Sequence, residues 1–213
     1  MKNIICSHKI TEEIEENLIN LGVNPIKLRG TEKFGELHPL SYHPDMFCFR
    51  LEKNNWIFYD NPVLCEYPYD VKLNAAMFGD NLICNGKYTD ERIIAYAKQT
   101  GKNIIDVKQG YAKCSVCIVD ENSIITSDES IYKKVTQNNI NALLIEKGHI
   151  DLNGYNYGFI GGCSGLINKN KLAFTGNITL HPNYNDIKKF CDNREVEVIS
   201  LSNKKLYDYG SLL

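Results

Sequence analysis

The chain has 213 residues, of which 43% are hydrophobic and 23% charged, and its formal net charge is −2 at pH 7. These values are ordinary for a globular protein with a sizeable core, and the lack of a basic patch excludes nucleic acid as the expected partner. No apolar stretch approaches the roughly 18 residues of a membrane span, and residues 1–16 lack the apolar region of a signal peptide. We therefore expect one domain over residues 1–213, located in the cytoplasm and not in a membrane.

Eight cysteines are many for a chain of this length. Because disulfides are rare in the cytosol, we expect free thiols, most of them serving as small buried core residues. The cysteines stand at positions 6, 48, 65, 84, 114, 117, 163 and 191. A chemical role for any one of them has to be argued from its position.

The chain opens with a predicted strand–helix–strand unit. Residues 3–6 have the apolar pattern of a short buried strand, and Thr11 is a suitable N-cap for a helix. Gly22 is expected to end that helix, and residues 23–28 form the second strand. No hairpin precedes this unit.

The middle of the chain continues with a hairpin and a second strand–helix–strand segment. The hairpin strands are expected near 45–51 and 55–60, and residues 61–80, which contain two prolines and no clear period, are expected to be an inserted loop. A strand, a helix and a strand are then predicted near 82–84, 89–100 and 103–107.

Two further hairpins follow, over 115–126 and 162–174, and each is followed by a helix and a strand. Asp128 is the expected cap of the first of these helices, which runs to about 138, and the second helix lies near 184–191. The strands that follow them are expected near 142–146 and 196–201.

The tail at 206–213 is strand-like and has no hairpin partner, whereas the first unit lacks an opening strand. We therefore expect an α/β fold of hairpin–helix–strand repeats, closed into a ring by pairing of the chain ends, because closure removes exposed sheet edges. An open α/β sandwich of four such units is the alternative.

Two short motifs stand at the heads of hairpins. His43-Pro44-Asp45 precedes one hairpin. Gly110-Tyr111-Ala112-Lys113-Cys114 precedes another, and in it the cysteine follows the glycine by four residues. Together with the repeats, these motifs resemble the guanidine-modifying enzymes, which form the pentein or β/α-propeller superfamily. In the deiminases of that superfamily an H-x-D supplies the catalytic histidine and a substrate-binding aspartate, and a glycine-rich turn supplies the nucleophilic cysteine.

The resemblance has gaps. The counterpart of the superfamily's E-G-G-D motif is Asp208-Tyr209-Gly210-Ser211, and no acid stands near Gly158–Gly162, where an F-x-R-D would fall. We count four units, whereas the superfamily usually has five, so residues 61–80 either hide a degenerate fifth unit or the ring holds four. The motif order is a circular permutation of the usual one.

The resemblance implies a covalent mechanism. Cys114 would be the nucleophile that adds to the carbon of an amidine or guanidine, and His43 would be the general acid and base. Asp45 would bind a cationic substrate, with Asp208 as the acidic partner. Gly110, Lys113 and Cys163 are further candidate substrate-binding residues, although Lys113 need not touch the sulfur because successive strand side chains point to opposite faces.

Other residues offer competing interpretations. Cys163, in GGCSG, is the rival nucleophile, although its glycines also suit strands that crowd together. Cys117 makes a CxxC with Cys114, but structural zinc needs four ligands and no second pair accompanies it. The second H-x-D, at His149, has no hairpin directly after it.

We expect an enzyme: a cysteine-dependent hydrolase or transferase acting on a small amidine or guanidine, with no cofactor and no metal. The alternative is a non-catalytic binding protein on the same fold, as is the ribosomal anti-association initiation factor. A clustered His43 and Cys114 in a cavity would favour the enzyme, and an apolar filling would favour the binder. The expected partner is a small molecule, and a homodimer is left open.

Overall fold

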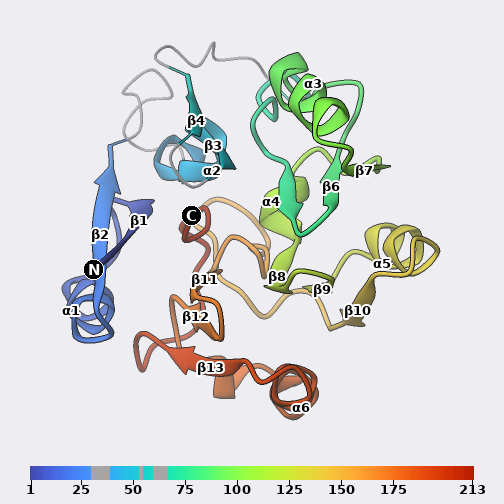
Figure 1. The fold of residues 1–213 in the computed structure, drawn as a ribbon. Coiled ribbons are helices and arrows are strands. Elements are labelled where there is room, and N and C mark those ends of the chain that lie inside the picture. Colours follow the sequence, from blue (N-terminus) through green and yellow to red (C-terminus); the bar gives the residue numbers. More distant parts are fainter. Residues whose placement is uncertain (30–38, 53–54, 60–66) are drawn as a thin grey trace.

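Five small sheets follow one another around a centre in the computed structural model, which describes residues 1–29, 39–52, 55–59 and 67–213 (Figure 1). The strands, sheet by sheet, are β1 (Lys2–Ser7) and β2 (Val23–Leu28); β3 (Cys48–Glu52) and β4 (Asn55–Phe58); β5 (Ala76–Phe78), β6 (Asn81–Cys84) and β7 (Asn103–Asp106); β8 (Cys117–Asp120), β9 (Ser123–Thr126) and β10 (Asn141–Leu144); and β11 (Ser164–Asn168), β12 (Lys171–Phe174) and β13 (Glu197–Ser200).

Four helices lie outside the sheets, and two helices of four residues lie near the centre (Figure 1). The outer helices are α1 (Glu12–Asn20), α3 (Glu91–Gln99), α5 (Glu129–Thr136) and α6 (Tyr184–Asp192), and the short ones are α2 (Pro44–Phe47) and α4 (Ala112–Ser115). Two 3₁₀ turns, Pro39–Tyr42 and Ile178–Leu180, complete the described elements.

Three of the sheets share one construction, which is the predicted hairpin–helix–strand repeat. In the sheet of β5, β6 and β7 the first two strands are antiparallel and the last two are parallel. The sheets that begin with β8 and β11 repeat this order. A parallel neighbour needs a crossover connection, and α3, α5 and α6 supply it, each with an apolar face turned inward.

The first sheet is completed by the end of the chain. β1 and β2 are parallel and joined by α1, whose predicted N-cap, Thr11, accepts a hydrogen bond from the backbone N–H of Ile14. Leu213 and Ile5 exchange two backbone hydrogen bonds of 2.9 Å. The C-terminal tail therefore pairs with β1, in the place where the other units have their first hairpin strand.

The predicted loop at 61–80 is wrong in part. Residues 60–66 lie outside the described residues, but β5 falls within the loop and pairs with β6. The short segment Ala76–Phe78 escaped notice because it holds only three residues, with no period to read. Its presence separates the hairpin of β3 and β4 from the unit of β6 and β7, so the described chain has five sheets and not four.

Two strand starts are also corrected. Residues 45–47 and 115 were expected in strands but lie in α2 and α4. Pro44 stands at the first position of α2, where its fixed φ favours a helix. The strand therefore begins only at Cys48, and its counterpart begins at Cys117.

The core lies between the sheets and the outer helices. Ile14 and Leu18 of α1, Ile93 of α3 and Ile187 of α6 are each at most 1% exposed, and burying such a side chain contributes about 1.5–3 kcal/mol. Among the described residues, none of the helices has the length and apolar character needed to cross a bilayer.

Candidate active site

The site is built from the segments that lead into the first strand of successive units. His43 and Asp45 precede β3, Asn74 precedes β5, and Cys114 precedes β8. Asp208 precedes the tail that pairs with β1. The segments before these strands therefore meet, although His43 and Cys114 do not come from successive units, because the β5–β7 unit stands between theirs in the chain.

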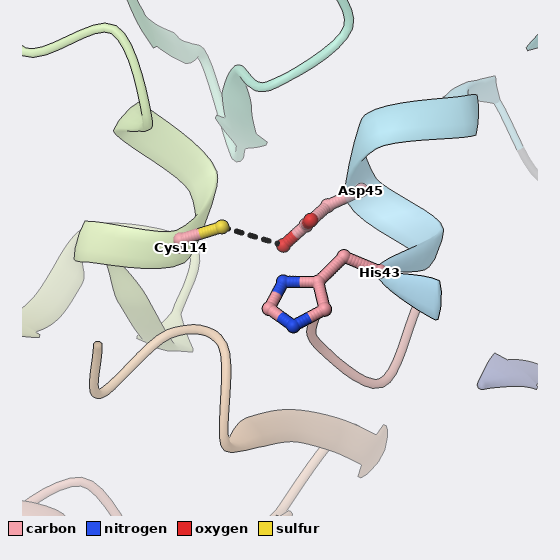
Figure 2. Close-up of side chains that lie close together, drawn as sticks. All are labelled: His43, Asp45 and Cys114. Carbon is pink, nitrogen blue, oxygen red and sulfur yellow. Dashed lines mark hydrogen bonds between the residues drawn. The ribbon is translucent and has the colours of Figure 1, made fainter. Parts of the chain in front are cut away.

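The thiol of Cys114 lies against two polar side chains, those of Asp45, which Figure 2 shows, and of Asn74. Its Sγ donates to Oδ2 of Asp45 at 3.1 Å and accepts from Nδ2 of Asn74 at 3.1 Å. The Oδ1 of the same amide accepts from the backbone N–H groups of Lys113 and Cys114, at 2.8 and 3.2 Å. Asn74 therefore holds both the backbone of α4 and its thiol.

The imidazole of His43 lies beside the thiol and the Asp45 carboxylate (Figure 2). One nitrogen of His43, the sulfur of Cys114 and one oxygen of Asp45 all lie within 4.8 Å of one another, and all three residues are buried. The Nδ1 of His43 is 3.7 Å from Oδ1 of Asp208. The structure thus brings together the four residues that the sequence nominated for catalysis and cation binding.

Asp208 is held in place by the backbone. Its Oδ2 accepts from the N–H of Phe159 at 2.9 Å, and its Oδ1 accepts from the N–H of Gly210 at 3.0 Å. Gly162 and Gly210 allow this packing, because a Cβ on the first would lie 2.0 Å from the Asp208 carboxylate. Gly210 has φ +80, and a Cβ there would meet His43 at 2.3 Å.

Lys113 reaches the cluster from the other side of α4. Its Nζ donates to Oγ of Ser211 at 3.0 Å, and that hydroxyl lies 2.7 Å from Oδ2 of Asp45. Lys113 is 9% exposed and Ser211 is 1% exposed. The lysine is therefore linked to Asp45 through a hydroxyl. Lys113 and Cys114 lie in α4 and not in a strand, so the strand alternation used to separate their side chains does not apply.

Burial sets the protonation of the thiol and of Asp208. Burial raises the pKa of Cys114 well above its ordinary value, and the nearby charges of Asp45 and Asp208 raise it further, whereas the hydrogen bond from Asn74 lowers it. Burial also raises the pKa of Asp208 to about 6, although its two backbone hydrogen bonds and Lys113 oppose that shift. At neutral pH the resting site therefore holds a neutral thiol and an ionised Asp208.

Two cavities border this cluster and share no lining residue. The smaller, of about 270 Å³, is lined by His43, Cys114 and Asp208 together with apolar and aromatic side chains. The larger, of about 940 Å³, is bordered by Asp45 and Lys113 and by residues of β3, β5, β8 and β11. The first strands of four units thus line the larger cavity, and the thiol opens into the smaller one.

The cluster also has the composition of a metal site. An imidazole nitrogen, a thiolate and a carboxylate oxygen are the donors that bind Zn²⁺, and His43, Asp45 and Cys114 present one each within 4.8 Å. This is three protein ligands, the number found in catalytic zinc sites. These residues could therefore hold a divalent ion, although the sequence led us to expect none.

Other residues singled out in the sequence lie outside this cluster of contacts. Cys163 is fully buried in a hydrophobic cluster that also contains Cys117, and its thiol donates to the carbonyl of Ile160 at 3.4 Å. Gly110 packs under Tyr67, because a Cβ there would meet that ring at 2.7 Å. His149 is 41% exposed and lies 3.6 Å from Glu146.

Sequence reasoning missed two parts of the site. Asn74 lay in the supposed loop, and no motif marks an amide that binds a thiol. The aromatic wall of the smaller cavity comes from Tyr155, Tyr157 and Phe159, which appear in the sequence as the aromatic-rich stretch YNYGF. That enrichment was the available signal.

A family model of unknown function, DUF6873, matches residues 55–213. The chain belongs to this family. The matched region of the DUF6873 chain contains Asn74, Cys114 and Asp208, whereas His43 and Asp45 precede it. No curated protein matches significantly.

Among solved structures, the chain is similar to a dimethylarginine dimethylaminohydrolase, crystallised as an adduct with 4-chloro-2-hydroxymethylpyridine. The TM-score is 0.58 at 13% identity, and the match covers 94% of the DUF6873 chain and 92% of the hydrolase chain. The two proteins therefore share a fold over nearly their whole length.

Proposed function

We propose that this chain is a cysteine-dependent hydrolase or transferase acting on small amidines or guanidines, on a β/α-propeller closed by its two ends. The observation that carries the proposal is the meeting of a thiol, an imidazole and two carboxylates at the end of a small cavity. A dimethylarginine dimethylaminohydrolase has a similar fold. Two cavities at the cluster favour an enzyme over the binder that an apolar filling would indicate.

A cationic substrate would activate the thiol. The resting Cys114 is neutral because burial and the charges of Asp45 and Asp208 raise its pKa. An amidinium that enters between the carboxylates offsets those charges and so lowers the pKa of the thiol. The proton then passes to His43, and the thiolate attacks the amidinium carbon.

The remaining steps return the site to its starting state. The carbon–nitrogen bond breaks as His43 gives its proton to the leaving amine. Water, or an acceptor amine, then attacks the S-linked carbon, with His43 taking a proton, and the carbon–sulfur bond breaks. With water, an amidinium and H₂O become an amide and an ammonium, so atoms and charge balance.

Selective labelling tests the proposal. We expect 2-chloroacetamidine, a cationic alkylating agent, to modify Cys114 before the other cysteines, as mapped by mass spectrometry after brief exposure at several pH values. We also expect an adduct of Cys114 with 4-chloro-2-hydroxymethylpyridine, the compound bound in the similar hydrolase, formed by thiolate displacement of chloride. A Cys114 that reacts no faster than the other cysteines would refute the proposal.

Metal binding is the rival outcome at the same residues. If His43, Asp45 and Cys114 serve a metal, zinc should bind stoichiometrically by calorimetry in the apo protein, and a chelator should abolish turnover. The proposed mechanism predicts turnover that survives chelation and labelling that added zinc suppresses, because zinc would occupy the thiolate.

A further inference from the structure

The smaller cavity has aromatic walls above its reactive end. Phe159 stands between two tyrosines: its ring centroid is 6.4 Å from that of Tyr111, at 33°, and 6.3 Å from that of Tyr157, at 83°. Tyr155 also lines the cavity and is 48% exposed. The rings therefore form a continuous wall from the buried cluster out to solvent.

Some of these rings are held in position by their neighbours. The hydroxyl of Tyr111 donates to Asp70 at 2.7 Å, and its ring packs on Tyr67 at 5.5 Å. The backbone N–H of Phe159 donates to Asp208, which fixes the main chain that carries this ring beside the carboxylate at the end of the cavity. A wall held in this way before a ligand arrives favours binding, because little side-chain freedom is lost.

The cavity is suited to a cation with a flat or apolar body. Aromatic faces attract cations through their negative quadrupole, and the effect is strongest where water is excluded. A delocalised amidinium or guanidinium is more weakly hydrated than an ammonium and gives up its water at a lower cost. A volume of about 270 Å³ is just below the 300–1,000 Å³ of ordinary ligand pockets.

A carboxylate on the substrate would meet repulsion. Asp208 lines the cavity, and Asp45 lies directly behind the thiol. Within the described part of the chain, the cavity is otherwise lined by His43 and Cys114 beside Asp208, and by Leu40, Leu152, Asn156 and the aromatic residues. A free α-carboxylate would therefore lie against ring faces and near two acids, which oppose it electrostatically.

We propose that the substrate is a compact amidinium or guanidinium with an aryl or N-alkyl substituent and no carboxylate, whose apolar part lies on Phe159 and Tyr157. This inference rests on the proposed function, since it names the substrate class of the same site. The cation lies toward Asp208 and Cys114, and the substituent points along the aromatic wall.

Protection of Cys114 from 2-chloroacetamidine tests this inference. Benzamidine should give half-protection at about a tenfold lower concentration than acetamidine, because its phenyl ring packs on the aromatic wall and the methyl group of acetamidine makes a much smaller contact. Arginine, which carries a carboxylate, should protect less well than either. Equal protection by benzamidine and acetamidine, or the best protection by arginine, would overturn the inference.

Matched variants locate the effect. Phe159→Leu and Tyr157→Leu should each reduce the advantage of benzamidine to about threefold or less, and the former keeps the backbone bond to Asp208. Tyr69→Leu is the control, because Tyr69 is 59% exposed and its ring packs on Tyr88 at 5.6 Å. If the advantage of benzamidine is lost equally in Tyr69→Leu, the assignment of Phe159 and Tyr157 as the rings that contact the substituent is wrong.

A second measurement keeps the two proposals apart. Calorimetry on Cys114→Ser with benzamidine and acetamidine reports binding without any reaction of the thiol. If Cys114 of the native chain is not labelled selectively but this variant prefers benzamidine, the proposed function fails and the aromatic site stands. If labelling is selective and neither measurement shows the preference, only the inference about the substrate fails.

Discussion

Two cysteines that each follow a glycine within four residues occupy comparable places in the fold, each shortly before the first strand of a unit: Cys114 before β8 and Cys163 before β11. Both are at most 2% exposed, and burial raises the pKa of both well above the ordinary value. Their neighbours differ. Cys114 contacts Asp45 and Asn74 and borders a cavity, whereas the thiol of Cys163 donates to the carbonyl of Ile160 within a hydrophobic cluster.

The comparison shows that neither burial nor a raised pKa distinguishes a reactive thiol from a core residue. Both residues have the glycine-rich context that suggested a nucleophile. What separates them is access to a cavity and contact with groups that can change charge when a ligand binds. The position before the first strand of a unit therefore holds a core residue in the β11 unit and a residue that borders a cavity in the β8 unit.

Exchange of each sulfur for oxygen should separate the two cysteines most strongly. Cys114→Ser should reduce covalent labelling by 2-chloroacetamidine, and turnover of an amidine, by at least about a hundredfold, because a hydroxyl is a far weaker nucleophile at neutral pH. Cys163→Ser should keep both within about threefold of the native chain. Intact-mass spectrometry measures the first effect, and a reversal of the two results would transfer the nucleophile to Cys163.

Removal of the charge beside the thiol should change the labelling rates of a neutral and a cationic reagent in opposite directions. Asp45 raises the pKa of Cys114, so Asp45→Asn should give more thiolate and speed labelling by neutral iodoacetamide, by about tenfold for each unit that the pKa falls. Labelling by cationic 2-chloroacetamidine should slow by about tenfold, because its partner is lost.

Labelling rates measured with both reagents at pH 7 test these opposite changes, with Asp186→Asn on α6 as the control variant. Cys163 should keep its slow rate with both reagents in both variants. Two reagents that change in the same direction in Asp45→Asn would remove Asp45 from the role of cation partner.

The titration of Asp208 should appear in both reactivity and stability. Its pKa is raised from 3.8 to about 6, so labelling of Cys114 by cationic 2-chloroacetamidine should rise by several-fold through pH 6, because the carboxylate that forms attracts this reagent. Because the folded pKa lies above the unfolded one, the residue stabilises the fold at low pH, and that contribution is lost as the pH rises from 3.8 through about 6.

Asp208→Asn should remove both features. Its labelling rate should have no inflection near pH 6, and its unfolding free energy in urea should fall less than that of the native chain between pH 4 and 7. An unchanged inflection in this variant would assign the titration to another group.

Removal of the serine hydroxyl near each cysteine should give the smallest difference between the two cysteines. Ser211 links Lys113 to Asp45, and Ser164 donates to the carbonyl of Ile160 beside Cys163. Ser211→Ala and Ser164→Ala should each lower the unfolding free energy by about 1–2 kcal/mol. Only Ser211→Ala should also slow labelling by 2-chloroacetamidine, by about threefold, because Asp45 is then less well held. Equal labelling in the two variants would make Ser211 purely structural.

Much of the repeat architecture could be predicted from local patterns. Thr11 and Asp128 cap α1 and α5 as expected, and the helices end where Gly22 and Gly101 stand with positive φ. These features depend on residues close in sequence. The short β5 and the four-residue helices α2 and α4 were missed, since three or four residues carry no period and their conformation is set by the segments around them.

Some residues of the candidate site could also be predicted from the sequence, and others could not. His43, Asp45, Cys114 and Asp208 could be nominated from motif order, because each stands in a recognisable position before a strand. Asn74 could not, since its role depends on a contact with a residue 40 positions away. Lys113 was adjacent to the thiol in sequence, but its side chain reaches Ser211 at the other end of the chain.

By itself, the sequence determined the four longer helices, the caps of α1 and α5, three of the hairpins and the residue types available for chemistry. These are consequences of side-chain periodicity and local hydrogen bonding. Only the tertiary structure decided which cysteine faces a cavity, which carboxylates approach it and which rings enclose the space above it. Those choices depend on how five sheets are placed around a common centre, and contacts between distant segments determine that placement.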